Sequence, residues 1–294
     1  MIDLHGRVAI VTGAGGGLGR QHALLLARRG ARVVVNDLGE AADTVAAEIA
    51  AGGGQARAIH GSVTDAEAVQ AMVDGVLADW GRVDILVNNA GILRDKSFAK
   101  MELADFRAVV DVHLMGAVHC CKATWEAMRA QGYGRIVMTT SSSGLYGNFG
   151  QANYGAAKMA LVGLMQTLAL EGAKYDIRVN CLAPTAYTRM MEGILPQAQL
   201  DALDPALVSP ALLALVADDA PTRAILCAGA GSYELANITL TQGIHLGADA
   251  TAEAIVARWR EVADRDGEMV PGTGFDQARH ELRKAGLPIE DAAA

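Results

Sequence analysis

Tyr154 and Lys158 are the two residues of this 294-residue chain whose types and spacing most plainly allow chemistry. They lie four residues apart in a stretch of helical character, so both side chains face the same way. A phenol has a pKa of about 10 and is a poor base at neutral pH, but a neighbouring ammonium group favours the phenolate and lowers that pKa. We therefore predict that Tyr154 transfers a proton and that Lys158 assists it.

A hydroxyl-rich segment, residues 139–143, precedes Tyr154 by about 13 residues and follows an apolar run. Ligand sites of α/β proteins form at the carboxyl ends of parallel strands. A hydroxyl such as that of Ser141 is therefore expected to hydrogen-bond a substrate oxygen. A second polar segment, residues 88–91, also follows a predicted strand, and its alternative interpretation is an Asx turn.

Glycine is concentrated between the first predicted strand and the first predicted helix, in T-G-A-G-G-G-L-G at residues 12–19. Glycines let the backbone turn tightly and approach a pyrophosphate, and a helix N-terminus supplies free N–H groups and a positive dipole end. The segment therefore predicts a dinucleotide site rather than an ordinary turn. The expected contacts are Gly13, Gly15, Gly17, Leu18 and Gly19.

Asp37 ends the second predicted strand, about 20 residues beyond this loop. A carboxylate there can accept hydrogen bonds from both ribose hydroxyls of the adenosine half and repels a 2′-phosphate. No basic residue interrupts residues 13–19, although Arg20 follows. We therefore expect NAD rather than NADP as cofactor; the alternative role of Asp37 is that of a turn-forming residue.

Alternating strands and helices must position these residues. Seven strands are predicted at residues 7–12, 32–36, 55–59, 83–87, 135–140, 177–181 and 224–227. Helices are predicted at residues 17–29, 41–51, 65–80, 106–130 and 152–174. This alternation predicts an α/β fold with a Rossmann-like, doubly wound parallel sheet and helices on both faces. Helical stretches at 252–262 and 277–285 are interpreted as a C-terminal extension, about 233–294, of a single domain, residues 1–294.

The composition fits such a domain. Hydrophobic residues make up 51% of the chain and charged residues 20%, which allows a buried core. The formal net charge of -8 argues against a nucleic-acid binder. The sequence shows no signal peptide and no apolar run long enough to span a bilayer, so no membrane insertion is expected. The four cysteines lack metal-site spacing, which favours reduced thiols, no metal and a cytoplasmic location.

Four motifs in order resemble the short-chain dehydrogenase/reductase family: T-G-x-x-x-G-x-G from Thr12, N-N-A-G from Asn88, Ser141, and Y-x-x-x-K from Tyr154. The resemblance implies an enzyme that transfers hydride between the CH–OH group of a secondary alcohol and a nicotinamide, commonly as a homodimer or homotetramer. It further implies that Ser141 orients and polarises the substrate oxygen, that Tyr154 exchanges its proton, and that Lys158 lowers the tyrosine pKa and holds the ribose.

The resemblance also implies further cofactor contacts. Asn88 and the backbone of the next three residues would stabilise the central sheet and the cofactor, and two residues after the sixth strand would flank the nicotinamide amide. These contacts are Asn89, Ala90, Gly91, Pro184 and Thr188.

Three positions depart from the family's common pattern. His113 stands where many members have a catalytic asparagine; it either supports the proton relay or only packs. Ser62 stands where many members have an aspartate that contacts adenine, so this contact would rest on the Ser62 hydroxyl and the Val63 backbone. Thr185 replaces the usual glycine after Pro184.

Longer strings resemble one branch of the family: V-V-V-N-D-L-G, N-N-A-G-I-L-R-D-K-S-F, V-H-L-M-G and Y-G-N-F-G-Q-A-N-Y. This branch is the (3R)-hydroxyacyl-CoA dehydrogenase unit of the peroxisomal multifunctional β-oxidation enzyme, with its bacterial stand-alone relatives. In it the histidine of V-H-L-x-G is also found. The implied substrate is a (3R)-3-hydroxyacyl-CoA or a related lipid or steroid acyl-CoA. The alternatives are a hydroxysteroid or general secondary alcohol dehydrogenase without CoA preference and, from another class, a non-catalytic NAD-sensing module.

Two regions are expected to contact the substrate. Arg94 and Lys96, just beyond N-N-A-G-I-L, are candidates for binding CoA phosphates, the alternative being a solvated loop. Residues 187–210 are interpreted as a helical lid over the site. Its apolar side chains would line a pocket or pack within the lid: Met190, Met191, Ile194 and Leu195.

Overall fold

The computed structural model describes residues 1–187 and 196–288 of the chain. The chain forms two compact units, Met1–Leu235 and Ala236–Ala294. Thr188 and the predicted lid residues Met190, Met191, Ile194 and Leu195 lie outside the described residues, and the other predicted site residues belong to the described part of the first unit. The organisation into a single domain, residues 1–294, stays a prediction.

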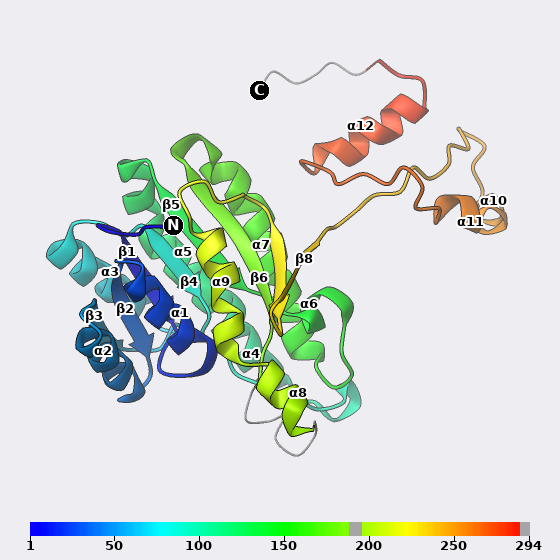
Figure 1. The fold of residues 1–294 in the computed structure, drawn as a ribbon. Helices are drawn as coiled ribbons and strands as arrows, with labels where there is room; N and C mark the ends of the chain where they lie inside the picture. The colour runs from blue at the N-terminus through cyan, green and yellow to red at the C-terminus, as the bar shows by residue number, and fades with distance from the viewer. Residues whose placement is uncertain (188–195, 289–294) are drawn as a thin grey trace. The chain divides into compact units, whose positions relative to one another are not determined.

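The first unit is built on an eight-stranded sheet with the order β3-β2-β1-β4-β5-β6-β7-β8 (Figure 1). Strands β1 to β7 pair in parallel. The chain winds outward from β1 in one direction and from β4 in the other, so the topological switch point lies between these two strands. The strands are β1 (Val8–Thr12), β2 (Arg32–Asp37), β3 (Gln55–His60), β4 (Ile85–Asn88), β5 (Gly134–Thr139), β6 (Ile177–Thr185), β7 (Ile225–Gly229) and β8 (Ser232–Ala236).

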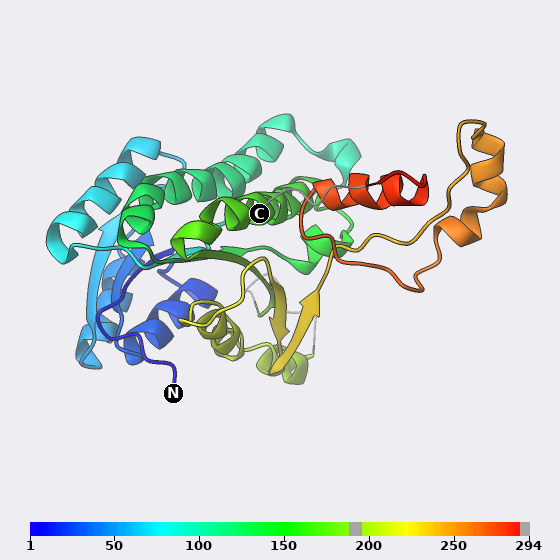
Figure 2. The ribbon, with the colours of Figure 1, turned by 90° about the horizontal axis from the view of Figure 1, so that it is seen from above.

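Helices cover both faces of this sheet, as the view from above shows (Figure 2). One face carries α1 (Gly17–Arg28), α2 (Ala41–Ala51) and α9 (Ser209–Leu215). The other carries α3 (Ala66–Trp80), α4 (Leu103–Val110), α5 (Gly116–Gln131) and α7 (Ala152–Gly172). Continuous apolar runs in the strands, such as Val33, Val34 and Val35, are fully buried between the two layers. The predicted doubly wound α/β fold is confirmed.

The sheet has one strand more than predicted. The eighth strand, β8, follows a turn in which Ala230 and Gly231 both have positive φ. Four of its five residues are exposed, so it has no buried apolar pattern that could identify it in the sequence.

The helix predicted at residues 106–130 is interrupted. Between α4 and α5 lies one π-helical turn, Asp111–Met115, which contains His113. A π turn inserts one residue and still leaves an apolar face toward the core, so helical periodicity did not reveal it. Such turns are frequent at functional sites, and this one contains His113, one of the three residues that depart from the family's common pattern.

Short elements complete the first unit. They are η1 (Phe98–Lys100), α6 (Ser142–Tyr146), η3 (Ala173–Tyr175), α8 (Gln197–Ala202) and η5 (Pro205–Leu207). Of the predicted lid, α8, η5 and the start of α9 are described.

The second unit contains α10 (Ala252–Ala257), α11 (Trp259–Val262) and α12 (Phe275–Lys284). The helix predicted at 252–262 is divided at Arg258, whose φ and ψ of -108° and 22° are not helical. Backbone hydrogen bonds join Leu240 to Met269, and the Thr241 hydroxyl donates to the Val262 carbonyl at 2.8 Å. Within residues 1–187 and 196–288, no helix is both long and apolar enough to cross a membrane.

Candidate active site

The glycine-rich loop closes tightly against the end of β4. Gly13 has a φ of 62°, and a Cβ atom built on it would lie 2.8 Å from the Cα atom of Ala90. A Cβ atom on Gly19 would lie 2.2 Å from the Gly13 carbonyl oxygen. Side chains at either position would force the loop and α1 apart. Gly16 precedes α1 without a side-chain cap, which leaves the first N–H groups of the helix available for a ligand.

Asn89 and Thr12 join the N-N-A-G segment to this loop. The Asn89 Nδ2 atom donates to the carbonyl oxygens of Thr12 and Gly13 at 3.0 and 3.1 Å. The Thr12 hydroxyl accepts from the backbone N–H groups of Asn89 and Ala90 at 3.0 and 3.1 Å. The motif thus shapes the loop through the end of the neighbouring strand. The preceding Asn88 instead donates to the Cys121 sulfur at 3.4 Å.

Asp37 is bound to the loop by its own carboxylate. Its Oδ2 atom accepts from the backbone N–H of Gly15 at 2.8 Å, and its Oδ1 atom accepts from that of Leu38 at 2.7 Å. A Cβ atom on Gly15 would lie 2.9 Å from the same Oδ2 atom. The carboxylate therefore has two functions available to it, shaping the loop and meeting a ligand at the end of β2.

A cavity of about 360 Å³ lies at the switch point. Glycine backbone, the Asp37 carboxylate and the segment after β4 surround it, and this set of groups fits the adenosine and pyrophosphate part of a dinucleotide. The lining residues are Gly13, Gly16, Asn36, Asp37, Leu38, Gly61, Ser62, Val63, Asn89, Ala90, Gly91, Ile92 and Val112. Of the five predicted loop contacts only Gly13 lines it; Gly15, Gly17, Leu18 and Gly19 do not.

Ser62 and Val63 line this cavity, and both have protein partners. The Ser62 hydroxyl shares a hydrogen bond with the Thr64 hydroxyl at 2.8 Å. The Val63 carbonyl oxygen lies 2.9 Å from Nδ1 of His119. An adenine contact by the Ser62 side chain would therefore share the hydroxyl with Thr64.

Strand β5 and helix α7 bring Ser141, Tyr154 and Lys158 together. Lys158 Nζ donates to the carbonyl oxygen of Thr139 at 2.5 Å and lies 5.4 Å from the centroid of the Tyr154 ring. Ser141 caps α6, where its hydroxyl accepts from the backbone N–H of Ser143 at 3.2 Å. The Ser141 side chain is also hydrogen-bonded to Tyr154. A hydroxyl, a phenol and an amine thus share one site at the carboxyl edge of the sheet.

Burial dominates the acid–base properties of this site. It lowers the pKa of Lys158 to about 7, and the nearby Cys181 opposes that change. Burial also raises the pKa of Tyr154, the hydrogen bond with Ser141 lowers it, and the charge of Asp95 raises it. The lysine is therefore partly charged at neutral pH, and a proton on Tyr154 is retained until another positive charge favours the phenolate.

His113 packs between the N-N-A-G segment and the catalytic tyrosine candidate. Its Nε2 atom lies 2.8 Å from the carbonyl oxygen and 3.1 Å from the backbone nitrogen of Ile92, so the tautomer decides which bond forms. Its ring meets the Tyr154 ring edge-on at 5.2 Å. Burial, and then the charge of Lys158, lowers the pKa of His113 to about 3. The imidazole is therefore neutral near pH 7, and its buried Nδ1 atom has no protein partner among the described residues.

Arg94 and Lys96 are both exposed and share one carboxylate. Arg94 Nε lies 3.8 Å and Lys96 Nζ 3.5 Å from the carboxylate oxygens of Asp105 in α4. The backbone of this segment is fixed, because Asn153 donates to the Arg94 carbonyl at 3.0 Å and Lys96 N–H to the Gly150 carbonyl at 2.9 Å. Asp95 lies between the two cations in the sequence and accepts from Gln151 Nε2 at 2.6 Å, so the formal charges of Arg94 and Lys96 are balanced by Asp95 and Asp105 beside the start of α7.

Two further predicted contacts lie near β6. Pro184 is partly buried and stands opposite Ala228 in the pairing with β7. Thr188 lies outside the described residues, as do the four apolar lid residues Met190, Met191, Ile194 and Leu195.

Sequence reasoning missed the roles of α6 and Thr140. The hydroxyls of residues 139–143 were treated as one run, whereas the Thr140 hydroxyl donates to the Lys158 carbonyl oxygen at 2.7 Å. The chain changes from strand to helix within residues 139–143, so successive hydroxyls point in different directions. This change could have indicated that they have separate roles.

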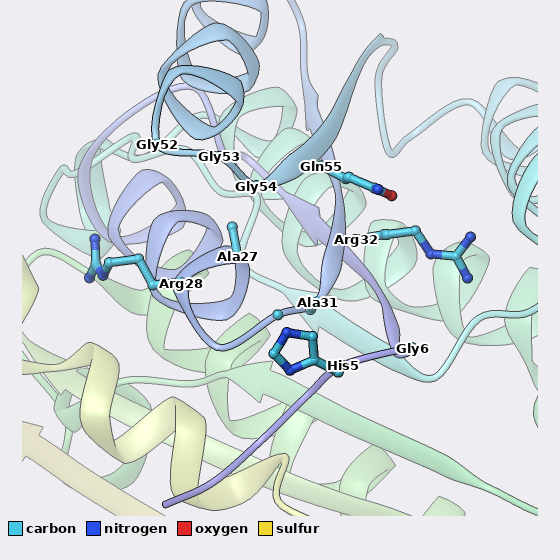
Figure 3. Close-up of a pocket in the computed structure, with 11 residues that line it drawn as sticks. His5, Gly6, Ala27, Arg28, Ala31, Arg32, Gly52, Gly53, Gly54 and Gln55 are labelled. Carbon is cyan, nitrogen blue, oxygen red and sulfur yellow. The ribbon is translucent and has the colours of Figure 1, made fainter.

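A larger cavity, of about 640 Å³, lies at the opposite edge of the sheet, around the starts of β2 and β3 (Figure 3). It is lined by His5, Gly30 and Gly52–Gly54 among others. The side chains of Arg28 and Arg32 at its rim point away from each other. The groups that carry chemistry gather at the carboxyl edge, so we place the active site there despite the smaller volume.

Comparison with known proteins identifies the family of the chain. The family model described as short chain dehydrogenase matches residues 7–199. A short-chain type dehydrogenase/reductase of Mycobacterium tuberculosis is 44% identical over 283 residues, which cover 92% of this chain and 99% of that protein.

Two solved structures are similar over most of the chain. The full-length peroxisomal multifunctional enzyme type 2 of Drosophila melanogaster has a TM-score of 0.83 and 39% identity, over 97% of this chain but only 50% of its own. A 7α-hydroxysteroid dehydrogenase, solved with NADH and 7-oxo glycochenodeoxycholic acid, has a TM-score of 0.73 and 32% identity, over 78% of this chain and 95% of its own. The chain thus spans half the length of the multifunctional enzyme.

Proposed function

We propose that this chain, which belongs to the short-chain dehydrogenase family, is an NAD-dependent dehydrogenase of (3R)-3-hydroxyacyl-CoA or a related lipid acyl-CoA. As a family member it is an oxidoreductase that acts on CH–OH groups of small molecules with a nicotinamide cofactor. The observation that carries the proposal is the convergence of Ser141, Tyr154 and Lys158 at the carboxyl edge of the sheet that also carries the glycine-rich loop. The choice of acyl-CoA follows from the branch resemblance and from the likeness to the multifunctional enzyme.

The residues of the chain have separate tasks in this reaction. The Ser141 hydroxyl binds and orients the substrate oxygen, and the Tyr154 hydroxyl exchanges a proton with the same oxygen. Lys158 supplies positive charge that favours the phenolate, because it lies against the Tyr154 ring. A nicotinamide bound in this site would supply the hydride acceptor for alcohol oxidation and the hydride donor for ketone reduction.

The cofactor preference rests on Asp37. Its carboxylate lies at the end of β2, where it lines the cavity and would face the adenosine ribose. A second negative charge at the 2′ position would be placed against it in a partly buried site. Gly13, Gly15, Gly19 and the Asn89–Gly91 backbone would hold the rest of the dinucleotide, and Ser62 with Val63 the adenine.

A CoA substrate requires positive charge at the rim of the site. Arg94 and Lys96 provide it, and their backbone is tied to residues 150 and 153 at the entrance to α7. Asp95 and Asp105 balance the formal charge of the two cations, so phosphates would be bound by the individual Arg94 and Lys96 side chains and not by a strongly basic rim. Removal of either cation should raise KM for acyl-CoA and leave the KM of a CoA-free alcohol unchanged.

The decisive experiment measures NADH formation from (3R)- and (3S)-3-hydroxyacyl-CoA of several chain lengths, with NAD and NADP in parallel. Turnover of the 3R epimer with NAD is expected. Tyr154→Phe should lower turnover by about 100-fold or more, because general acid–base catalysis contributes that much. A protein that binds NADH but turns over no secondary alcohol would instead be an NAD-sensing module.

The second candidate function is a hydroxysteroid or general alcohol dehydrogenase without CoA preference. The structural likeness to 7α-hydroxysteroid dehydrogenase favours it. Free hydroxysteroids belong in the same assay, and turnover of these alone would retain the catalytic residues and discard the CoA assignment. A homodimer or homotetramer and a cytoplasmic location remain predictions.

A further inference from the structure

We infer that Thr140 is a positioning residue that holds the end of β5 against the turn of α7 carrying Lys158, and so sets the spacing between Ser141 and Tyr154. The inference rests on the proposed function, in which these three side chains act on one substrate.

Thr139 and Thr140 bind Lys158 at two separate points. The Thr140 hydroxyl donates to the Lys158 carbonyl oxygen at 2.7 Å, and the Thr139 carbonyl oxygen accepts from Lys158 Nζ at 2.5 Å. Thr140 is fully buried, and its backbone N–H donates to the Leu182 carbonyl of β6 at 2.8 Å. The threonine is thus fixed to the sheet by its backbone and to α7 by its side chain.

Two glycines hold the other side of Ser141 just as closely to α7. A Cβ atom on Gly144 would lie 2.8 Å from the Cβ atom of Lys158. A Cβ atom on Gly155, within α7, would lie 3.1 Å from the Ser143 carbonyl oxygen. Ser141 therefore lies between two contact points with one helix, Thr140 before it and Gly144 after it.

This arrangement determines the geometry of the site before any ligand binds. Tyr154 lies one helical turn before Lys158, so a contact at Lys158 also places the phenol. The Ser141 hydroxyl, already bonded to Ser143 N–H, then interacts with Tyr154. A displacement of about 1 Å between catalytic groups can cost about 100-fold in rate.

Three variants separate this role from simple packing. Thr140→Val keeps the shape and removes the donor, whereas Thr140→Ser keeps the donor. Thr124→Val is the matched control, because the Thr124 hydroxyl is equally buried and donates to a helical carbonyl, that of Cys120, at 2.9 Å within α5.

Thr140→Val should lower kcat for (3R)-3-hydroxybutyryl-CoA, or for the best substrate of the wild type, by about tenfold or more. KM for substrate and cofactor should change by less than about twofold, since no binding group is removed. In the pH profile of kcat for alcohol oxidation, the rising limb should move to higher pH. Lys158 is held less firmly beside Tyr154 in this variant, so its charge favours the phenolate less. The other charged or titratable groups that act on this pair, His113, Asp95 and Cys181, remain in place.

Amide hydrogen exchange provides a readout that is independent of turnover. Peptides covering residues 152–162 should exchange faster in Thr140→Val than in the wild type or in Thr140→Ser, and they should be unchanged in Thr124→Val. If the wild type turns over no secondary alcohol, the proposed function fails and the exchange rates still decide whether Thr140 holds α7.

Three results would overturn the inference. The first is a Thr140→Val variant with the kcat and the pH profile of the wild type. The second is an equal loss of kcat in Thr140→Val and Thr140→Ser. The third is unchanged amide exchange of residues 152–162 in Thr140→Val. Equal loss of kcat in Thr124→Val would likewise show that any buried threonine hydroxyl has this effect.

Discussion

The imidazole of His113 meets the phenol ring of Tyr154 edge-on, with ring centroids 5.2 Å apart and ring planes at 90°. A Cβ atom on Gly91 would lie 2.3 Å from Cε1 of the same imidazole, so the ring occupies the space of the missing side chain. Through His113 the π turn thus connects the segment that lines the cofactor cavity with the residue proposed to transfer the proton.

This relationship predicts that catalysis requires a hydrogen-bonding side chain at position 113, but does not require that side chain to gain or lose a proton. His113→Asn should retain most of kcat, because an amide can still bond the Ile92 backbone, whereas His113→Ala should lose about tenfold or more by freeing Tyr154. Since the pKa of His113 is lowered to about 3, wild type and His113→Asn should have the same pH limbs above about pH 5. Loss of a limb near neutral pH in His113→Asn would instead identify His113 as a group that titrates in the relay.

Asp37 should control the choice between NAD and NADP through its charge. Asp37→Asn removes the charge and keeps an oxygen that can accept from Gly15 N–H, whereas Asp37→Ala removes both. The ratio of kcat/KM for NADP to that for NAD should rise about tenfold or more in both variants, because like-charge repulsion is relieved. Activity with NAD should fall further in Asp37→Ala, since the loop loses its acceptor. An unchanged cofactor ratio in both would assign Asp37 to the loop alone.

Lys158→Met should lose turnover and gain thermal stability, and the gain should depend on pH. Burial lowers the pKa of Lys158 from its ordinary 10.5 to about 7, so the wild type loses stability as pH falls between these values, and the loss is complete below about pH 7. The methionine variant should therefore melt above the wild type at about pH 6, and this difference should shrink toward about pH 10. Melting temperatures over this range measure it. A difference that does not depend on pH would contradict burial of the ammonium group.

Arg135 should be required for stability and not for chemistry. It is fully buried at the amino edge of the sheet, where its guanidinium donates to the carbonyls of Gly134, Asp176, Ala217 and Asp218 and to the Asp176 carboxylate. Arg135→Met removes the guanidinium donor from the Ala217 and Asp218 carbonyls, whereas Asp176 keeps Gly134 N–H on its carbonyl and Arg178 on its carboxylate. The variant should cost about 1–3 kcal/mol of unfolding free energy in urea titrations. The remaining folded protein should keep its kcat.

The control for this loss is Arg57→Met, which breaks an exposed pair with Asp79. Exposed ion pairs contribute at most about 1 kcal/mol, so this variant should unfold close to the wild type. A loss of kcat in folded Arg135→Met would show that the amino edge communicates with the site.

The sequence by itself determined the features that depend on neighbouring residues. Seven strands, the glycine-rich turn into α1 and the shared face of Tyr154 and Lys158 follow from periodicity and local backbone chemistry, and the structure contains each of them. The carboxyl ends of adjacent parallel strands also had to meet at one edge, which placed Asp37, Asn89 and Ser141 together.

Only the tertiary structure decided the contacts between residues distant along the chain. The bond from Thr140 to the Lys158 carbonyl, the place of His113 beneath Gly91 and the Asp105 carboxylate shared by Arg94 and Lys96 are such contacts. Each depends on how two elements are rotated and spaced against each other. Periodicity identifies the buried face of a helix, but the depth to which one residue packs is determined by the side chains of another element.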